Sequence, residues 1–228
     1  MAEWNESKKI LINELNLNNK KILDVGCGNG WFGFWAESNG CEVDAIDPSE
    51  KQIKEAKYKD KENKINFMLA GAENINDLNN TYDLIFFFNS LHHIPINLME
   101  ESIKYCRNKM NTNGRIIIIE PIAAGNFHNF VKNIDDETKV RDLAYKAIKN
   151  CEKYNLKINS ELLYNEVKAF SDGHECIDFL SKVDENRIDY IDNNKDFLLN
   201  KFNKLSNYND NKYEFLQPMR LNIISNKK

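Results

Sequence analysis

The sequence predicts an α/β fold, with a doubly wound, mostly parallel sheet and a helical insertion or cap in the C-terminal half. In the first half of the chain, short apolar runs alternate with helical patterns, which is typical of βαβ units. The stretches "DLIFFF" and "RIIIIE" carry unbroken apolar runs, as expected of central parallel strands covered on both faces. With 228 residues, 42% of them hydrophobic, the chain can bury one sizeable core, so we expect a single domain.

The elements of the first half are predicted from changes of hydrophobic period and from the turn residues between them. In chain order they are a strand at 21–25, a helix at 30–38, a strand at 42–46, a helix at 49–59, strands at 65–69 and 82–88, a helix at 96–109 and a strand at 114–120. Ligands of doubly wound sheets lie off the carboxyl ends of the strands, so the site is expected there.

The second half has a different pattern. After Pro121, long polar helical stretches are predicted at about 127–154 and 175–205, and the apolar segment 213–224 predicts a last strand with 162–170 as its partner. The expected organisation is a cofactor-binding core over 1–121, a mostly helical substrate or cap segment over 122–212 and the last sheet strand over 213–226.

Charge and composition limit the partners and the location. The net charge is −4 and the Lys and Arg residues are dispersed among acids, so no nucleic-acid partner is expected. No run of about 18 apolar residues occurs, and the charged start "MAEWNESKK" lacks the apolar region of a signal peptide. We therefore expect a cytoplasmic protein with no membrane partner. The cysteines show no C-x-x-C spacing, and the scattered His128 and His174 predict no metal site.

The stretch "ILDVGCGNGWFG", between the first predicted strand and helix, matches two nucleotide-binding fingerprints. Gly28, Gly30 and Gly33 form G-x-G-x-x-G, the dinucleotide pattern. Asp24, Gly26, Gly28 and Gly30 form D-x-G-x-G-x-G, which suits S-adenosylmethionine. The second pattern is favoured, because Gly26 already breaks the strand, Asp24 is acidic where a dinucleotide site has an apolar residue, and Gly33 lies inside an apolar helix where close packing explains it.

Four segments in a fixed order extend this interpretation. They are "ILDVGCGNG", "VDAIDPS", "YDLIFFFNSLHHIP" and "GRIIIIEP", and they span about residues 20–121. Together they resemble class I S-adenosylmethionine-dependent methyltransferases of the small-molecule type. The resemblance implies a Rossmann-like methyltransferase fold with a seven-stranded sheet whose last strand, 213–224, is reversed, and it implies S-adenosyl-L-methionine as the cofactor.

The resemblance also assigns residues to the loop end of the cofactor. Gly26, Gly28 and Gly30 would flank its methionine and ribose parts, and Asp24 would support the loop and the ammonium group. Asp47, about 20 residues after the loop, would bind the ribose hydroxyls, as an acid there does in either cofactor class.

The remaining cofactor contacts would come from the ends of two later strands. Ala72, through its backbone N–H, and Glu73 fall where such enzymes hold the adenine. Many relatives have an aspartate at the position of Gly71, which this sequence lacks. Asn89 matches the residue that meets the methionine portion.

Candidate catalytic residues lie at the same strand ends. Methyl transfer requires an aligned acceptor and, where needed, a base that removes its proton. His93 and His92 in "SLHHIP" suit this role, and Glu120 could bind a hydroxyl or amine of the acceptor.

The predicted function is therefore methyl transfer to an O or N atom of a small-molecule acceptor. One alternative is a macromolecular acceptor, either tRNA or protein. The other is an inactive module that only binds the cofactor.

Overall fold

The computed structural model describes residues 4–227, and the chain divides into two compact units. The larger unit comprises Leu11–Glu120, Val140–Leu162 and Arg220–Lys228. The smaller unit comprises Met1–Ile10, Pro121–Lys139 and Leu163–Met219. Each unit is therefore assembled from three separate stretches of sequence.

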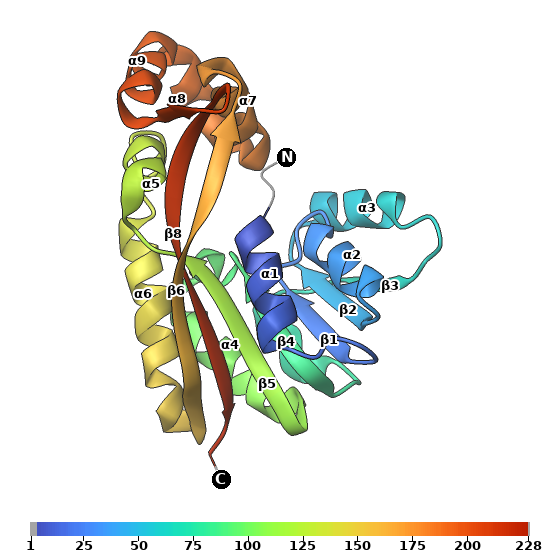
Figure 1. The fold of residues 1–228 in the computed structure, drawn as a ribbon. Coiled ribbons are helices and arrows are strands. Elements are labelled where there is room, and N and C mark those ends of the chain that lie inside the picture. Colours follow the sequence, from blue (N-terminus) through green and yellow to red (C-terminus); the bar gives the residue numbers. More distant parts are fainter. Residues whose placement is uncertain (1–3, 228) are drawn as a thin grey trace. The chain divides into compact units, whose positions relative to one another are not determined.

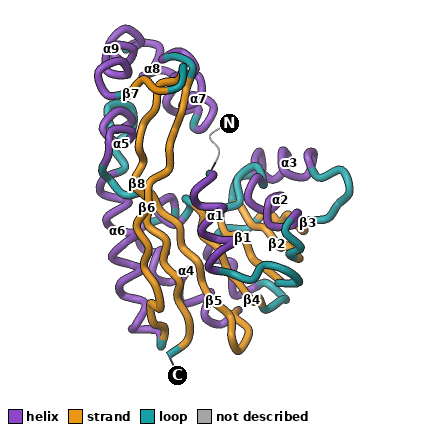
Figure 2. Tube along the Cα trace, in the orientation of Figure 1, coloured by secondary structure: helices purple, strands orange, loops and turns teal. Residues whose placement is uncertain are grey.

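One eight-stranded sheet has the order β3-β2-β1-β4-β5-β8-β6, with β7 paired to β8 (Figures 1 and 2). The strands are β1 Lys21–Val25, β2 Glu42–Asp47, β3 Ile65–Leu69, β4 Tyr82–Phe88, β5 Met110–Pro121, β6 Leu156–Phe170, β7 Asn207–Asn209 and β8 Lys212–Asn226. All pairings among β1 to β5 are parallel, whereas the arrows of β6 and β8 point in opposite directions in Figure 1. The predicted doubly wound, mostly parallel sheet is confirmed.

The topological switch point of the sheet lies between β1 and β4. The chain winds from β1 through β2 to β3 on one side and from β4 to β5 on the other. Connections at such a point leave a crevice outside the carboxyl ends of the two central strands. The glycine loop follows β1, and Asn89 follows β4, so both predicted segments lie at the carboxyl ends of the two central strands.

Both faces of the larger unit's sheet are covered by helices. The helices of the chain are α1 Asn5–Glu14, α2 Trp31–Ser38, α3 Glu50–Lys59, α4 Ile96–Lys109, α5 Gly125–Val131, α6 Thr138–Lys149, α7 Gly173–Val183, α8 Ile188–Asn193 and α9 Lys195–Leu205. On β4, Phe86 packs 4.7 Å from the ring of Phe32 in α2, while its neighbour Phe87 belongs to the core that contains Ile103 of α4 and Ile148 of α6. Adjacent strand residues face opposite sides, so β4 is buried on both, as its apolar run predicts.

The smaller unit has an aromatic core of its own. Phe130, Phe202 and Phe215 are fully buried there and contact one another. Its N-terminal segment is fixed to β6, because the Glu166 carboxylate, 1% exposed, accepts both the N–H and the hydroxyl of Ser7 at 2.6 Å. Among the described residues, no helix is both long and apolar enough to span a membrane.

The helical half differs from its predicted boundaries. The stretch 127–154 is broken before α6, where Asp136 accepts the N–H of Thr138 at 3.0 Å and caps the new helix. Likewise, Asp172 caps α7 by accepting the N–H of Glu175 at 2.9 Å, and the stretch 175–205 contains three helices instead of one. The acidic side chains of Asp136 and Asp172 therefore accept backbone N–H groups where α6 and α7 begin.

Candidate cofactor and active site

The glycine loop between β1 and α2 has a left-handed backbone at alternate positions. Gly26, Gly28 and Gly30 have φ angles of 74°, 53° and 84°. The N–H groups of Gly26 and Cys27 both donate to the carbonyl of Ile46, at 2.8 and 3.0 Å. The loop is thereby fixed to the end of β2, and its path requires residues that tolerate positive φ.

The space around each glycine shows whether neighbouring side chains exclude a Cβ there or leave room for a ligand. A Cβ on Gly26 would lie 2.6 Å from Cβ of Ser90, and one on Gly30 would lie 2.7 Å from the Phe67 ring. At Gly28 the nearest atom would be 4.0 Å away, so its α-carbon faces open space. Gly33 has no positive φ, and a Cβ there would meet Val43 and Ile65 at an ordinary 3.6 Å. Gly33 therefore packs α2 against β2 and β3 with room for a Cβ, so the close packing predicted to explain this glycine does not require it.

Asp24 is a buried carboxylate behind the loop. It is 1% exposed, and its Oδ2 atom has no hydrogen-bond partner among the described residues. Burial, and secondarily the nearby charge of Asp47, raises the pKa of Asp24 to about 8. A cationic ligand beside this oxygen would favour the ionised form.

Asp47 connects the loop to α3. Its Oδ2 accepts the N–H of Gly28 at 2.9 Å, and its Oδ1 accepts the N–H of Ser49 at 2.8 Å. A carboxylate oxygen has a second acceptor position, so each can still accept a ribose hydroxyl. Asp47 thus shapes the loop and lies within the predicted ribose position.

Ala72 and Glu73 begin a short 3₁₀ helix, Ala72–Asp77, after β3. Ala72 is 7% exposed, whereas Glu73 is exposed and its carboxylate folds back towards Gly71. An adenine contact through the backbone of Ala72 is compatible with this geometry, and it stays a prediction.

The strand-end segment after β4 is held by hydrogen bonds across three strands. Ser90 donates its hydroxyl to the carbonyl of Val25 at 2.5 Å, and Glu120 Oε1 accepts the N–H groups of Ser90 and Leu91 at 3.1 and 3.0 Å. Glu120 Oε2 contacts Nδ1 of His92. The Glu120 carboxylate, 5% exposed, therefore orients both the segment after β4 and the His92 ring.

The two histidines differ in exposure. His92 is 4% exposed, and His93 is exposed with its ring 4.0 Å from that of His92. Asn89, just before them, has a φ of 53°, and its Oδ1 is buried without a hydrogen-bond partner among the described residues. The structure therefore brings Asn89, both histidines and Glu120 to one strand end.

Sequence reasoning missed Ser90. Its Cβ excludes any side chain at Gly26, and its hydroxyl ties β4 to β1. The pairing of β1 with β4 brings these residues together, and no local pattern in the sequence reports that pairing. The only available signal was its place directly after Asn89.

These residues fit S-adenosylmethionine better than a dinucleotide. Two buried acceptor oxygens, Asp24 Oδ2 and Asn89 Oδ1, have no donor within residues 4–227, and the open face of Gly28 allows close approach. A ligand with an ammonium group and a positive sulfonium supplies donors and positive charge. A pyrophosphate supplies neither a donor nor positive charge for these two oxygens. The parallel sheet and this loop are the arrangement expected of a class I S-adenosylmethionine-dependent methyltransferase domain.

Comparisons with known proteins identify the same family. Residues 22–114 match the family described as a methyltransferase domain. A putative methyltransferase from Bacillus halodurans is 17% identical, with a TM-score of 0.60 over 97% of this chain and 98% of that chain. Magnesium protoporphyrin IX methyltransferase from Synechocystis, solved with bound S-adenosylmethionine, is 16% identical, with a TM-score of 0.51 over 95% and 76%. Residues 22–114 therefore carry a methyltransferase domain, the solved structures share the class I fold, and S-adenosylmethionine is the cofactor of such domains.

Curated relatives match part of their own length. A tRNA U34 carboxymethyltransferase from Nautilia profundicola is 28% identical over 65% of this chain and 48% of that protein. A ubiquinone biosynthesis O-methyltransferase from Pelagibacter ubique is 32% identical over 48% of this chain and 45% of that protein. The chain thus spans about half the length of the curated relatives it matches.

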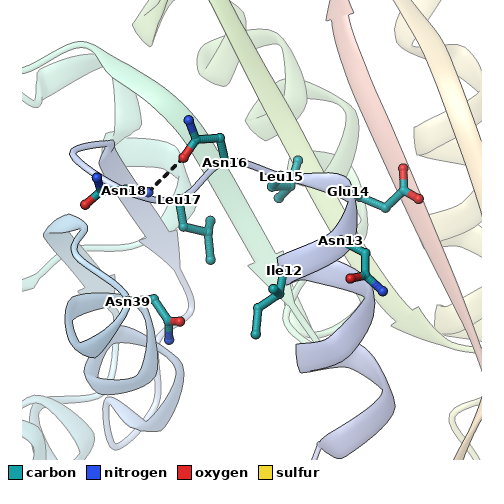
Figure 3. A pocket seen from close by; sticks show the side chains of 8 residues that line it. All are labelled: Ile12, Asn13, Glu14, Leu15, Asn16, Leu17, Asn18 and Asn39. Carbon is teal, nitrogen blue, oxygen red and sulfur yellow. Dashed lines mark hydrogen bonds between the residues drawn. The ribbon is translucent and has the colours of Figure 1, made fainter.

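A cavity of about 480 Å³ lies elsewhere in the larger unit (Figure 3). Residues 12–18 and Asn39 line it, with Asn16 and Asn18 joined by a hydrogen bond. Residues 12–18 precede β1 at its amino end and Asn39 follows α2, whereas the glycine loop follows the carboxyl end of β1. The cavity contains none of the predicted site residues and is separate from the cofactor position.

Replacing Asp47 tests the ribose assignment. We expect Asp47→Ala to weaken S-adenosylhomocysteine binding by more than about tenfold, because the ribose loses an ionised acceptor and Gly28 loses its partner. Calorimetric titration measures the change. Asp77→Ala, an exposed acid in the 3₁₀ helix after β3, is the matched control and should keep the affinity. An unchanged dissociation constant for Asp47→Ala would remove this residue from the site.

Proposed function

We propose that the chain transfers a methyl group from S-adenosylmethionine to an O or N atom of a small-molecule acceptor. The arrangement of unpartnered acceptor oxygens around the open glycine loop carries the cofactor part of this proposal. The acidic balance of the chain, with a net charge of −4 and dispersed cations, supports a small acceptor over a polyanionic one. The family match ends at residue 114, and we expect residues 122–212 to contribute the contacts that select the acceptor.

In the proposed mechanism, the protein aligns the acceptor and removes its proton. When bound, the cofactor supplies a methyl group on a positively charged sulfur, which is already activated for in-line displacement. His93, exposed at the strand end, takes the acceptor proton as the new bond to carbon forms. His92 supports the His93 ring, and Glu120 acts as a positioning residue through His92 and the backbone of Ser90 and Leu91.

A tRNA acceptor is the second candidate. Several curated relatives from different bacteria are tRNA U34 carboxymethyltransferases, which supports a nucleic-acid acceptor. The matches cover less than half of those proteins, so parts of them that could contact tRNA have no counterpart in the matched region.

Labelled methyl transfer separates the candidates. The protein is incubated with cofactor labelled in the methyl group and with a bacterial extract, and the products are separated into small molecules, RNA and protein. Label in small molecules that resist nuclease and protease supports the proposal. Label that nuclease releases supports the tRNA candidate, and protease-released label supports a protein acceptor. An absence of transfer, with intact cofactor binding, supports a binding module and contradicts the proposal.

The histidine pair makes a separate prediction. We expect His93→Ala to lower turnover by about a hundredfold or more, because a positioned general base contributes roughly 10² to 10⁴. Cofactor affinity should stay nearly constant, as measured by calorimetry on the same preparation. His174→Ala is the matched control, since His174 is exposed on α7 and should leave both quantities unchanged. Unaltered turnover in His93→Ala would exclude this histidine as the base.

A further inference from the structure

Gln52 is a polar side chain near the glycine loop, and its buried carboxamide oxygen has no hydrogen-bond donor within the part of the chain that the structure describes. It lies in the first turn of α3, after the capping residue Ser49, whose hydroxyl accepts the Gln52 N–H at 3.4 Å. Its Oε1 atom is buried and has no hydrogen-bond partner among the described residues. A buried carboxamide oxygen without a donor is costly unless a ligand supplies one.

The amide lies across the open side of the loop. The Gln52 oxygen is the nearest atom to the position that a Cβ on Gly28 would occupy, at 4.0 Å. The N–H of the same glycine donates to Asp47 at 2.9 Å. Gly28 is therefore flanked by a carboxylate at its nitrogen and by a carboxamide facing its α-carbon.

The two side chains have complementary hydrogen-bonding chemistry. An ionised carboxylate only accepts, so Asp47 can take the protons of two hydroxyls and cannot serve their oxygen lone pairs. A carboxamide both donates and accepts. A neutral amide at position 52 also avoids adding a further negative charge near Asp24 and Asp47. The pair therefore suits a vicinal diol, which offers donors and acceptors together.

We propose that Gln52 is a ribose-recognition residue that hydrogen-bonds one hydroxyl of the cofactor diol while Asp47 accepts from the diol. This inference rests on the proposed function, because it assumes that S-adenosylmethionine binds at the glycine loop. It assigns Gln52 a role in affinity and in discrimination between ribose and deoxyribose, with no part in the transfer step.

The test combines a substitution in the protein with the removal of one ribose hydroxyl from the ligand, as in a double-mutant cycle. Wild type and Gln52→Leu are titrated with S-adenosylhomocysteine and with its 2′-deoxy and 3′-deoxy analogues. We expect Gln52→Leu to bind S-adenosylhomocysteine about five- to tenfold more weakly. For the analogue that lacks the contacted hydroxyl, the difference between wild type and variant should fall below about twofold, because neither partner of the bond remains.

The controls separate this inference from the function on which it rests. Lys54→Ala, an exposed residue of the same helix, should bind all three ligands like wild type. Equal unfolding temperatures of unliganded wild type and Gln52→Leu show that both are folded. An equal loss with all three ligands, or no loss at all, would overturn the role of Gln52 while leaving cofactor binding intact. Failure of wild type to bind S-adenosylhomocysteine would overturn the proposed function and this inference with it.

Discussion

Asp24→Asn is expected to bind S-adenosylmethionine at least about a hundredfold more weakly than wild type and to unfold at a higher temperature when no cofactor is present. The loss of affinity follows because a neutral asparagine cannot form the ion pair that the Asp24 carboxylate forms with the ammonium group of the cofactor. Truncating one partner of a buried charge pair costs about 2–5 kcal/mol. Binding is measured by calorimetry, and unfolding by scanning calorimetry of the unliganded protein. An affinity within about threefold of wild type would contradict the assignment.

The gain in stability has a defined pH dependence. The pKa of Asp24 is about 8 in the folded protein and near 4 in an unfolded chain. A raised folded-state pKa contributes stability that is fully present below the unfolded value and is lost as the pH rises through the folded value. Asparagine is neutral throughout, so the advantage of the variant should be absent near pH 4 and should reach a few kcal/mol near pH 8. Asp77→Asn, which alters an exposed acid, should show no such dependence.

The affinity of wild type for the cofactor should also vary with pH. Below about pH 8 Asp24 must release a proton to pair with the ammonium group, so affinity should rise with pH up to that value. Near pH 8 the α-amino group of the cofactor begins to lose its own charge, which ends the increase. Titrations between about pH 6 and 8 test this slope. A slope that persists in Asp24→Asn would assign the titration to another group.

Gly26→Ala is expected to abolish measurable cofactor binding, whereas Gly33→Ala should leave it within about threefold. At Gly26 the added Cβ would lie 2.6 Å from Cβ of Ser90, on a backbone with a φ of 74°. Strain of this kind costs about 1–3 kcal/mol, and overpacking adds about 1–3 kcal/mol. At Gly33 the added Cβ would meet side chains at 3.6 Å, and alanine favours a helix by about 1 kcal/mol. Calorimetry and thermal unfolding measure both variants.

A double variant checks the cause of the Gly26 effect. Ser90→Gly removes the Cβ that an alanine at position 26 would meet, so Gly26→Ala/Ser90→Gly should recover part of the lost stability. The positive φ remains, so recovery should be incomplete. Loss of binding in Gly33→Ala with intact binding in Gly26→Ala would reverse the assignment and favour the dinucleotide fingerprint.

The sequence alone was sufficient where hydrophobic period and turn residues agree. The predicted bounds of β1, β3, β4 and α4 coincide with those observed, and β8 pairs with β6 as predicted. Helix α1 and strand β7 were not predicted. The start of β5 at Met110 was also missed, because the turn residues of "MNTNG" predict a loop. In the structure Met110 pairs with Tyr82 of β4, so this stretch is part of the strand.

The site could be located from sequence but its internal connections could not. The residues named at the strand ends lie in the last positions of their strands or shortly after them, as the order of the motifs predicts. The dependence of Gly26 on Ser90 and the engagement of Glu120 with the segment after β4 come from strand pairing. Gln52 gave no signal, because its role depends on the space beside Gly28. The smaller unit combines three distant stretches, so no local pattern could define it.

The central claim is that the glycine loop holds S-adenosylmethionine. The most direct measurement is a calorimetric titration of the wild-type protein with S-adenosylhomocysteine, set beside an identical titration with NAD⁺. We expect saturable binding of one S-adenosylhomocysteine per chain and no heat of binding with NAD⁺. Saturable binding of NAD⁺, or no binding of either S-adenosylhomocysteine or S-adenosylmethionine, would contradict the claim.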